Sequence, residues 1–202
     1  ADLVVSVALL GVVGPDRVMT RRGAVPGDAI VVTGTLGRSE LGLQALRAGL
    51  AREGSVEDVV RRHLWPTPRI TEAQAIIDVA TPHAMIDVSD GLSTDLIHMA
   101  DESGVGVRID EQRLPIPDPV LEVSARLGLE PFSVALASGE EFELVVAMPV
   151  SEVERTIEHV TAVTGTSLTR IGEVTERGDG CVLVGADSGT RTLERRGYEH
   201  AI

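Results

Sequence analysis

The stretch Ala-Met-Ile-Asp-Val-Ser-Asp-Gly-Leu-Ser-Thr-Asp-Leu-Ile-His-Met (residues 84–99) predicts a strand, a tight turn and a helix in immediate succession. The residues from Ala84 to Val88 are mostly apolar, and Gly91 then permits a sharp turn. Apolar residues spaced three and four apart follow, which is the pattern of one helical face. We therefore expect Asp87 at the end of a strand and Asp90 at a helix N-terminus, where free backbone N–H groups point outward.

This turn combines residue types that bind metal and phosphate. Asp87 and Asp90 supply two carboxylates and Ser89 a hydroxyl within four positions. Carboxylates hold Mg²⁺, and amides at a helix N-terminus bind phosphate oxygens. The alternative is purely structural: Ser89 or Asp90 caps the helix, as such residues commonly do, and Asp87 bonds a neighbouring loop.

Composition limits the possible partners. The chain of 202 residues has 18 basic and 31 acidic residues, a formal net charge of −13, which argues against nucleic acid or an anionic membrane as the main partner. Aromatic residues make up only 2% of the chain, so it offers no stacking platform for single-stranded nucleic acid. A phosphate ligand would need Mg²⁺ to approach such a negative protein.

The cysteine and histidine patterns exclude some kinds of site. Cys181 is the sole cysteine, which excludes an intrachain disulfide and fits a reducing, cytoplasmic location. The five histidines are scattered without a nearby thiolate, so no zinc site is expected. The longest apolar run, Leu3 to Val13, is too short to span a bilayer, and we predict a strand there.

Hydrophobic patterning along the chain predicts an α+β fold. Strands and helices alternate irregularly, which favours a mixed β-sheet layered with helices on one face over a doubly wound parallel sheet. The further strands are predicted at residues 29–33, 105–109, 168–174 and 181–184, with one after the Gly139 turn. The further helices are predicted at residues 38–50, 56–63, 71–80, 119–127 and 150–163, and residues 131–137 are ambiguous.

Five segments in order resemble the thiamine-monophosphate kinases. That family belongs to the superfamily that includes aminoimidazole ribonucleotide synthetase, selenophosphate synthetase and the hydrogenase maturation protein HypE. The matching segments are Arg21–Asp28, Val32–Gly37, Pro66–Arg69, Ile86–Leu96 and Gly139–Leu144.

The resemblance implies a two-domain protein that forms a homodimer. Residues 1–20 would be the tail of an N-terminal ATP-binding domain, with one remnant strand. Residues 21–202 would be the C-terminal domain, which contacts substrate and nucleotide. The acidic metal motifs of the first domain are not present, so we expect this chain to be a fragment with little activity alone.

The resemblance also assigns roles to residues of the Arg21–Asp28 and Ile86–Leu96 segments. Asp87 and Asp90 would bind Mg²⁺, and Ser89 and Arg21 would contact ATP. Arg22 stands where the family has a small residue, which leaves open whether Arg21 or Arg22 makes the nucleotide contact.

Two further residues would bind the substrate, thiamine monophosphate. Glu141 lies where the family has Asp in Gly-Glu-Asp-Tyr-Glu-Leu, and Phe142 replaces the Tyr. Tyr198 matches an aromatic residue that packs on the substrate. The structural alternatives are a solvated turn carboxylate for Glu141, a C-terminal packing residue for Tyr198 and a surface ion pair for Arg21.

The implied reaction transfers the γ-phosphoryl group of ATP to thiamine monophosphate. The acceptor is already an anionic oxygen, so no catalytic base is expected, and Mg²⁺ would offset the repulsion between the two polyanions. One alternative is another ATP-using enzyme of the superfamily, making selenophosphate or aminoimidazole ribonucleotide. The other is a non-enzymatic binding or assembly module.

Overall fold

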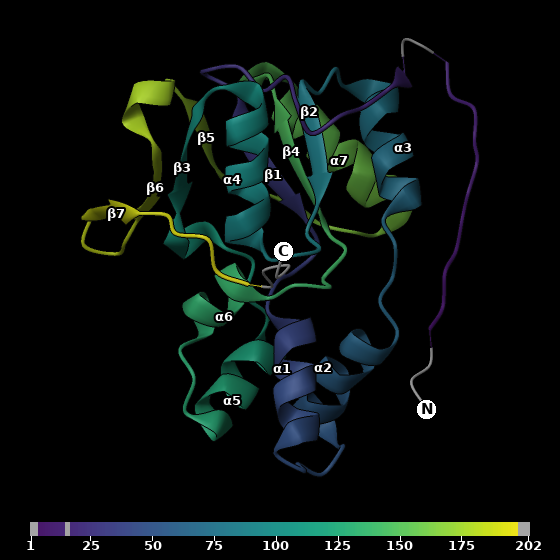
Figure 1. Cartoon of the computed structure of the whole chain (residues 1–202), viewed down its shortest axis with the longest axis vertical. Coiled ribbons are helices and arrows are strands. Elements are labelled where there is room, and N and C mark those ends of the chain that lie inside the picture. Colours follow the sequence, from purple (N-terminus) through teal and green to yellow (C-terminus); the bar gives the residue numbers. More distant parts are fainter. Residues whose placement is uncertain (1–3, 15–16, 198–202) are drawn as a thin grey trace.

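The computed structural model describes residues 4–14 and 17–197, which form a seven-stranded sheet with helices packed around it (Figure 1). The strands are β1 (Ala29–Thr33), β2 (Ala84–Asp87), β3 (Gly106–Asp110), β4 (Leu144–Met148), β5 (Leu168–Thr175), β6 (Cys181–Val184) and β7 (Thr190–Thr192). The α-helices are α1 (Arg38–Arg47), α2 (Gly54–Leu64), α3 (Ile70–Val79), α4 (Leu92–Ser103), α5 (Asp118–Leu127), α6 (Pro131–Ala137) and α7 (Val153–Thr164).

The sheet is mixed, as its sequence pattern predicts. The strand order is β2-β4-β1-β5-β3-β6-β7, and every neighbouring pair is antiparallel except β3 and β6, which run parallel. The Ala-Ile-Val-Val-Thr run of β1 is buried at every position, because β1 lies near the centre of the sheet. An uninterrupted apolar run is the expected signature of a strand covered on both faces.

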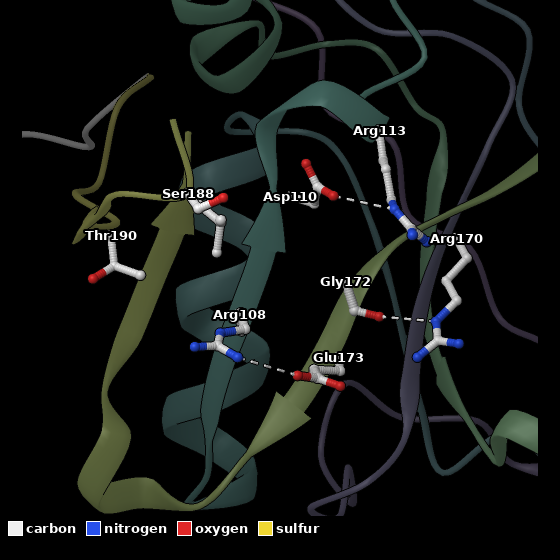
Figure 2. Close-up of a pocket in the computed structure, with 9 residues that line it drawn as sticks. Arg108, Asp110, Arg113, Arg170, Gly172, Glu173, Ser188 and Thr190 are labelled. Atoms are coloured by element: carbon white, nitrogen blue, oxygen red, sulfur yellow. Dashed lines mark hydrogen bonds and ion pairs between the residues drawn. The ribbon is translucent and has the colours of Figure 1, made fainter. Parts of the chain in front are cut away.

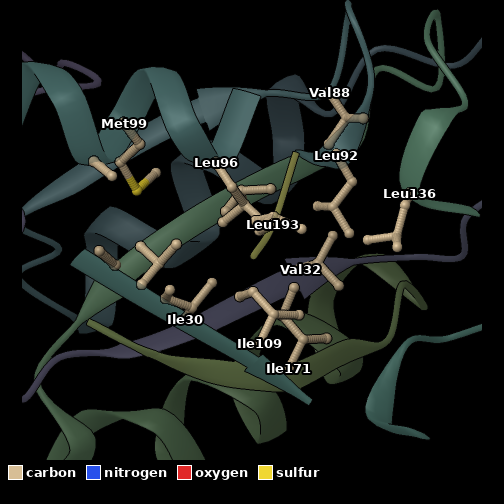
Figure 3. Close-up of a cluster of buried hydrophobic side chains, with 14 of the residues drawn as sticks. Ile30, Val32, Val88, Leu92, Leu96, Met99, Ile109, Leu136, Ile171 and Leu193 are labelled. Atoms are coloured by element: carbon tan, nitrogen blue, oxygen red, sulfur yellow. The ribbon is translucent and has the colours of Figure 1, made fainter. Parts of the chain in front are cut away.

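Helices cover both faces of the sheet, which corrects the expectation of a single covered face. Ile30 and Val32 of β1 pack against residues of α4, such as Leu96 (Figure 3). Ala29 and Val31, which point to the opposite face, pack with residues of α3 and α7. The irregular order of elements in the sequence favours one face, but the alternation along β1 requires a layer on each side.

A separate helical layer lies beyond one end of the sheet (Figure 1). Helices α1, α2 and α5 bury their own apolar cluster, with Leu41 of α1, Val59 of α2 and Val123 of α5 fully buried. This layer places the N-terminus of α1 opposite the turn that precedes α4.

The predicted N-terminal strand is wrong for the part of it that the structure describes. Residues 4–14 contain no strand, and their apolar side chains are exposed; Leu10 and Val12 are fully so. A strand needs a neighbour to bond its N–H and C=O groups, and no described element pairs with this segment. Figure 1 shows the segment running extended along the outside of the fold. The predicted domain boundary at residue 20 stays a prediction.

Two short elements of the structure could not be predicted from the sequence pattern. Residues 131–137, ambiguous in sequence, form α6, whose first turn is capped by the Glu130 carboxylate through the N–H groups of Phe132 and Ser133. Strand β7 was not predicted, because its three residues are polar and exposed. No helix among the described residues combines the length and the apolar character needed to cross a membrane.

Candidate functional site

A cavity of about 740 Å³ lies between α1 and the turn that precedes α4. Ser89 and Asp90 line one wall, and Ser39 and Glu40 of α1 line the other. The segment after α6 closes the cavity with Glu140. The structure therefore brings two of the predicted ligand-binding residues to one cavity, and we take this cavity as the candidate site.

Hydrogen bonds to the Asp95 side chain hold the turn at Ser89–Gly91. The Oδ2 atom of Asp95 accepts hydrogen bonds from the backbone N–H groups of Ser89, Asp90 and Gly91, at 3.0, 3.1 and 3.2 Å. Asp95 belongs to the first turn of α4 and is 2% exposed. The expectation of free amides therefore does not hold for the N–H groups of Ser89, Asp90 and Gly91, because a buried carboxylate already accepts their hydrogen bonds.

Burial raises the pKa of the Asp95 carboxyl to about 6. Removing the carboxylate from water disfavours its charged form, and the negative charge of Asp90 acts in the same direction. The three backbone N–H groups act in the opposite direction, because they stabilise the anion.

The turn is also enclosed by close backbone contacts. Gly91 has a φ of 122°, and a Cβ atom there would lie 2.8 Å from the carbonyl oxygen of Ala137. Gly197 has a φ of 138°, and a Cβ atom there would overlap the carbonyl oxygen of Asp90. Both positions therefore require glycine, because a side chain would displace the turn.

The segment before Gly197 is tied to the first turn of α4. The Ser93 hydroxyl accepts a hydrogen bond from the backbone N–H of Arg196 at 3.0 Å. The Thr94 hydroxyl donates to the carbonyl oxygen of Arg196 at 3.1 Å. Gly197 itself lines the cavity. Tyr198, the predicted substrate contact that follows, lies outside the described residues.

Asp87 occupies the predicted position at the end of β2. Its side chain is exposed, and it is not among the described residues that line the cavity. The strand end and the turn keep Asp87 and Asp90 within four residues of each other, on either side of Ser89. The predicted metal-binding role of these two carboxylates stays a prediction.

Arg21 lies at the other end of α4. It forms an ion pair with Glu102 at 3.6 Å, and both side chains are about half exposed. Glu102 is ten residues beyond the start of α4, a rise of roughly 15 Å along the helix axis. The structure therefore does not bring Arg21 to the wall formed by Ser89 and Asp90.

The Glu141 side chain is buried behind the cavity. Its Oε1 atom accepts hydrogen bonds from the N–H groups of Gly37 and Ser39, both at 2.9 Å, and from the hydroxyl of Ser138 at 2.6 Å. Glu141 is 0% exposed, and this burial raises its pKa. These three bonds occupy the Oε1 atom, while the Oε2 atom is buried without a hydrogen bond.

Glu140, one residue earlier, lines the cavity in its place. Its φ of 55° and the φ of 51° at Phe142 are left-handed, which is uncommon for residues with side chains. The N–H groups of these two residues bond the carbonyl oxygens of Ser89 and Val88, at 2.8 and 2.9 Å. The sequence has two adjacent carboxylates here, but no neighbouring residue in the sequence indicates which of them faces the cavity.

An ion-pair network supports the strand that follows. Arg69 grips the Glu143 carboxylate with two hydrogen bonds of 2.7 Å, which raises the pKa of the Arg69 guanidinium. Arg62 reaches the same carboxylate at 2.8 Å, and the Thr33 hydroxyl donates to it at 2.6 Å. Arg62 also donates to the carbonyl oxygen of Glu141. The Pro66–Arg69 segment therefore fixes the segment that carries Glu140 and Glu141.

The donor set fits a magnesium ion only in part. Within residues 4–14 and 17–197, no three histidine, cysteine or carboxylate side chains are grouped as a metal cluster. Mg²⁺ commonly binds through one or two protein carboxylates together with substrate phosphates and water. Asp87 and Asp90 fit that pattern, and a phosphate ligand would supply the remaining oxygens.

A second hollow of about 440 Å³ lies over strands β3 and β5 (Figure 2). Its charged residues form local contacts: Arg108 with Glu173 at 3.8 Å, and Arg113 with Asp110 at 3.1 Å. None of the residues that the sequence singles out lines this hollow. Its third arginine, Arg170, bonds the carbonyl oxygen of Gly172 at 3.5 Å. Because this hollow contains none of the predicted ligand-binding residues, we do not take it as the candidate site.

The fold and this site define the class of protein. Residues 25–185 match the family described as "AIR synthase related protein, C-terminal domain". The chain therefore belongs to this family. The resemblance of its five sequence segments to the thiamine-monophosphate kinases predicts this membership.

The chain is also similar to individual proteins of this superfamily. Thiamine-monophosphate kinase from Salmonella typhimurium is 36% identical to this chain over 202 residues, covering 98% of this chain and 60% of that protein. The solved structure of AaThiL complexed with AMPPCP and TMP has a TM-score of 0.76 at 32% identity, covering 91% of this chain and 54% of that one. The hydrogenase maturation protein HypE of E. coli has the same fold, with a TM-score of 0.73 at 25% identity, over 91% of this chain and 53% of that one. The chain thus spans about 60% of the length of the first curated relatives.

Proposed function

We propose that this chain is the substrate- and nucleotide-contacting domain of a thiamine-monophosphate kinase. Such an enzyme transfers the γ-phosphoryl group of ATP to thiamine monophosphate and produces thiamine diphosphate and ADP. The observation that carries the proposal is the placement of Ser89 and Asp90 on the wall of the 740 Å³ cavity. The relatives named thiamine-monophosphate kinase, and the AaThiL complex with AMPPCP and TMP, support the same assignment.

The charges of the cavity suit both ends of the substrate. Its carboxylates, Glu40, Asp90 and Glu140, would attract the cationic thiazolium ring of thiamine. Arg47 and His63 line the same cavity and supply positive or polar groups for phosphate oxygens. The acceptor oxygen is anionic near neutral pH, so the residues need to align the two phosphates rather than to remove a proton.

The proposed roles at the turn rest on the family resemblance, and the position of Ser89 and Asp90 on the cavity wall supports them. Ser89 would offer its hydroxyl to a nucleotide phosphate from the cavity wall. Asp87 and Asp90 would hold Mg²⁺, which when bound would offset the charge on the phosphates. The nucleotide contact of Arg21 and the substrate contacts of Glu141 and Tyr198 stay predictions, and Glu140 is the carboxylate that the geometry favours for the substrate.

The direct experiment measures thiamine diphosphate formed from ATP, Mg²⁺ and thiamine monophosphate. The protein is a version extended upstream to the length of the relatives, compared with the 202-residue chain by itself. We expect turnover by the extended protein and little by the chain alone. Comparable turnover by both would contradict the expectation of a fragment, and no turnover by the extended protein would contradict the proposed function.

The same assay tests the cavity wall. Asp90→Asn in the extended protein keeps the size of the side chain but removes its charge, and we expect kcat to fall roughly 100-fold because the metal and phosphates lose a ligand. Asp78→Asn, an exposed position on α3, is the matched control and should leave kcat unchanged. A near-wild-type rate for Asp90→Asn would remove Asp90 from the metal site.

Partners and location complete the proposal. By resemblance, the full-length protein is a homodimer, and its location is cytoplasmic. Supplying the substrates of aminoimidazole ribonucleotide or selenophosphate synthesis in place of thiamine monophosphate tests the other superfamily reactions under the same conditions.

A further inference from the structure

Asp95 accepts more hydrogen bonds than helix capping explains, because a first-turn side chain in a capping box bonds only the N–H of the cap residue, which is Gly91 here. A capping residue normally precedes the helix and accepts N–H groups from its first turn. Asp95 lies inside the helix and reaches back to three N–H groups that precede it, those of Ser89, Asp90 and Gly91. A single oxygen atom, Oδ2, accepts all three bonds.

The direction of these bonds decides what the turn shows to the cavity. The three amides point toward Asp95, which is 2% exposed, and so away from solvent. Ser89 and Asp90 line the cavity on the other side of the same backbone. A ligand in the cavity therefore meets side chains at this turn, while the amides are engaged behind it.

The backbone of Asp95 is itself fixed by the helix. Its own N–H bonds the carbonyl oxygen of Gly91 at 2.9 Å, as the first regular bond of α4. On the neighbouring positions, the hydroxyls of Ser93 and Thr94 hold the backbone of Arg196 against the helix. The Asp95 side chain thus attaches the Ser89–Gly91 turn to a helix whose own position is fixed by packing.

We propose that Asp95 is a positioning residue, which fixes the Ser89–Gly91 turn in the conformation that presents Ser89 and Asp90 to the cavity. It touches no ligand in this role and acts through the two residues that it orients. Groups that orient a ligand-binding residue commonly change activity or metal affinity by 10- to 100-fold when they are removed. The functional part of the proposal rests on the proposed kinase function.

The test compares Asp95→Asn and Asp95→Ala in the extended protein with the wild type. The alanine variant leaves the three amides without an acceptor, and asparagine keeps an acceptor oxygen but loses the charge. We expect kcat to fall roughly 10- to 100-fold in the alanine variant and less in the asparagine variant. The Mg²⁺ concentration for half-maximal rate should rise in the same order, and the amides of residues 89–91 should exchange faster with solvent.

Asp78→Asn on the exposed side of α3 is again the control and should change none of these measurements. If the alanine variant fails to fold, the asparagine variant decides. Lower thermal stability with unchanged kcat and unchanged Mg²⁺ dependence would show a purely structural residue and overturn the proposal. Unchanged exchange at residues 89–91 would also overturn it.

The experiments can refute the proposed function and the role of Asp95 independently of each other. If the wild-type protein forms no thiamine diphosphate, the proposed function fails, and the role of Asp95 is then decided by amide exchange together with the affinity for Mg²⁺ and AMPPCP. Wild-type affinity in the alanine variant would overturn the proposal there as well. If the wild type is active, only the difference between the variants and the wild type bears on Asp95.

Discussion

Two buried carboxylates, Asp95 and Glu141, hold the two walls of the same cavity. Each uses one oxygen atom to accept three hydrogen bonds, Asp95 from the turn before α4 and Glu141 from the start of α1 and from Ser138. They differ in the distance along the chain that their bonds cross. The donors to Asp95 lie four to six residues away, whereas Gly37 and Ser39 lie more than 100 residues from Glu141.

The difference separates a local support from a long-range one. Asp95 orders a turn that belongs to its own helix, so its loss leaves the rest of the contacts in place. Glu141 joins the start of α1 to the end of α6, and its Oε2 atom lies 3.8 Å from Arg62 without a hydrogen bond. We therefore expect the loss of Glu141 to affect folding, and the loss of Asp95 to affect mainly the site.

Glu141→Ala is expected to give the largest change in stability. It leaves two buried amides and a buried hydroxyl without an acceptor and removes one of the two carboxylates that lie near Arg62, so the free energy of unfolding should fall by about 3 kcal/mol or more. Urea unfolding of the 202-residue chain measures it. The exposed neighbour Glu140→Ala should leave the midpoint almost unchanged, and equal effects of the two variants would remove the long-range role of Glu141.

Asp95→Ala should cost less stability than Glu141→Ala. The three amides it frees belong to one turn at the cavity wall, where water can reach them once the turn relaxes, so we expect a loss of about 1 to 2 kcal/mol. The measurement is the same urea series. A loss as large as that of Glu141→Ala would mean that Asp95 supports the whole fold, and the contrast between the two carboxylates would disappear.

The raised pKa of Asp95 predicts a pH dependence of stability. The folded state holds the Asp95 proton up to about pH 6, and its ordinary value of 3.8 applies when the chain is unfolded. Between these values the folded state binds more protons, so the contribution of Asp95 to the free energy of unfolding falls as pH rises from about 4 to 6. Asp95→Asn should lose this fall, and parallel pH profiles of variant and wild type would contradict the raised pKa.

The smallest effect is expected at the far end of α4. Arg21→Ala breaks a half-exposed ion pair with Glu102 at 3.6 Å, and such surface pairs contribute little to folding because water and salt screen them. The unfolding midpoint should stay within error of the wild type. If the same variant nevertheless raises the KM for ATP in the extended protein, the predicted nucleotide contact of Arg21 gains support; an unchanged KM removes it.

Much of the fold could be predicted from local sequence patterns. The strands at 29–33 and 181–184 have the predicted bounds, and most helices differ from their predicted ranges by only a few residues. These elements follow from hydrophobic periodicity, which is a property of neighbouring residues. The strand at the N-terminus was wrong because an apolar run specifies a tendency, whereas a strand also requires a paired neighbour.

The sequence could predict which segments form the site, but not which of their residues face the cavity. The 84–99 stretch and the Gly139–Leu144 stretch both border the cavity, as expected, but their amides and carboxylates face directions that the sequence did not indicate. Asp95, rather than solvent or ligand, takes the amides of the turn. Glu140 lines the cavity while Glu141 is buried.

The sequence by itself determined the strand–turn–helix, its acidic residues and the family to which the chain belongs, because these depend on residue types at fixed short spacings. The tertiary structure decided which carboxylate of each neighbouring set is buried and which faces the cavity. Adjacent side chains point to different sides of the backbone, and the donors that select the buried member, such as Gly37 and Ser39 for Glu141, come from segments far away in the chain.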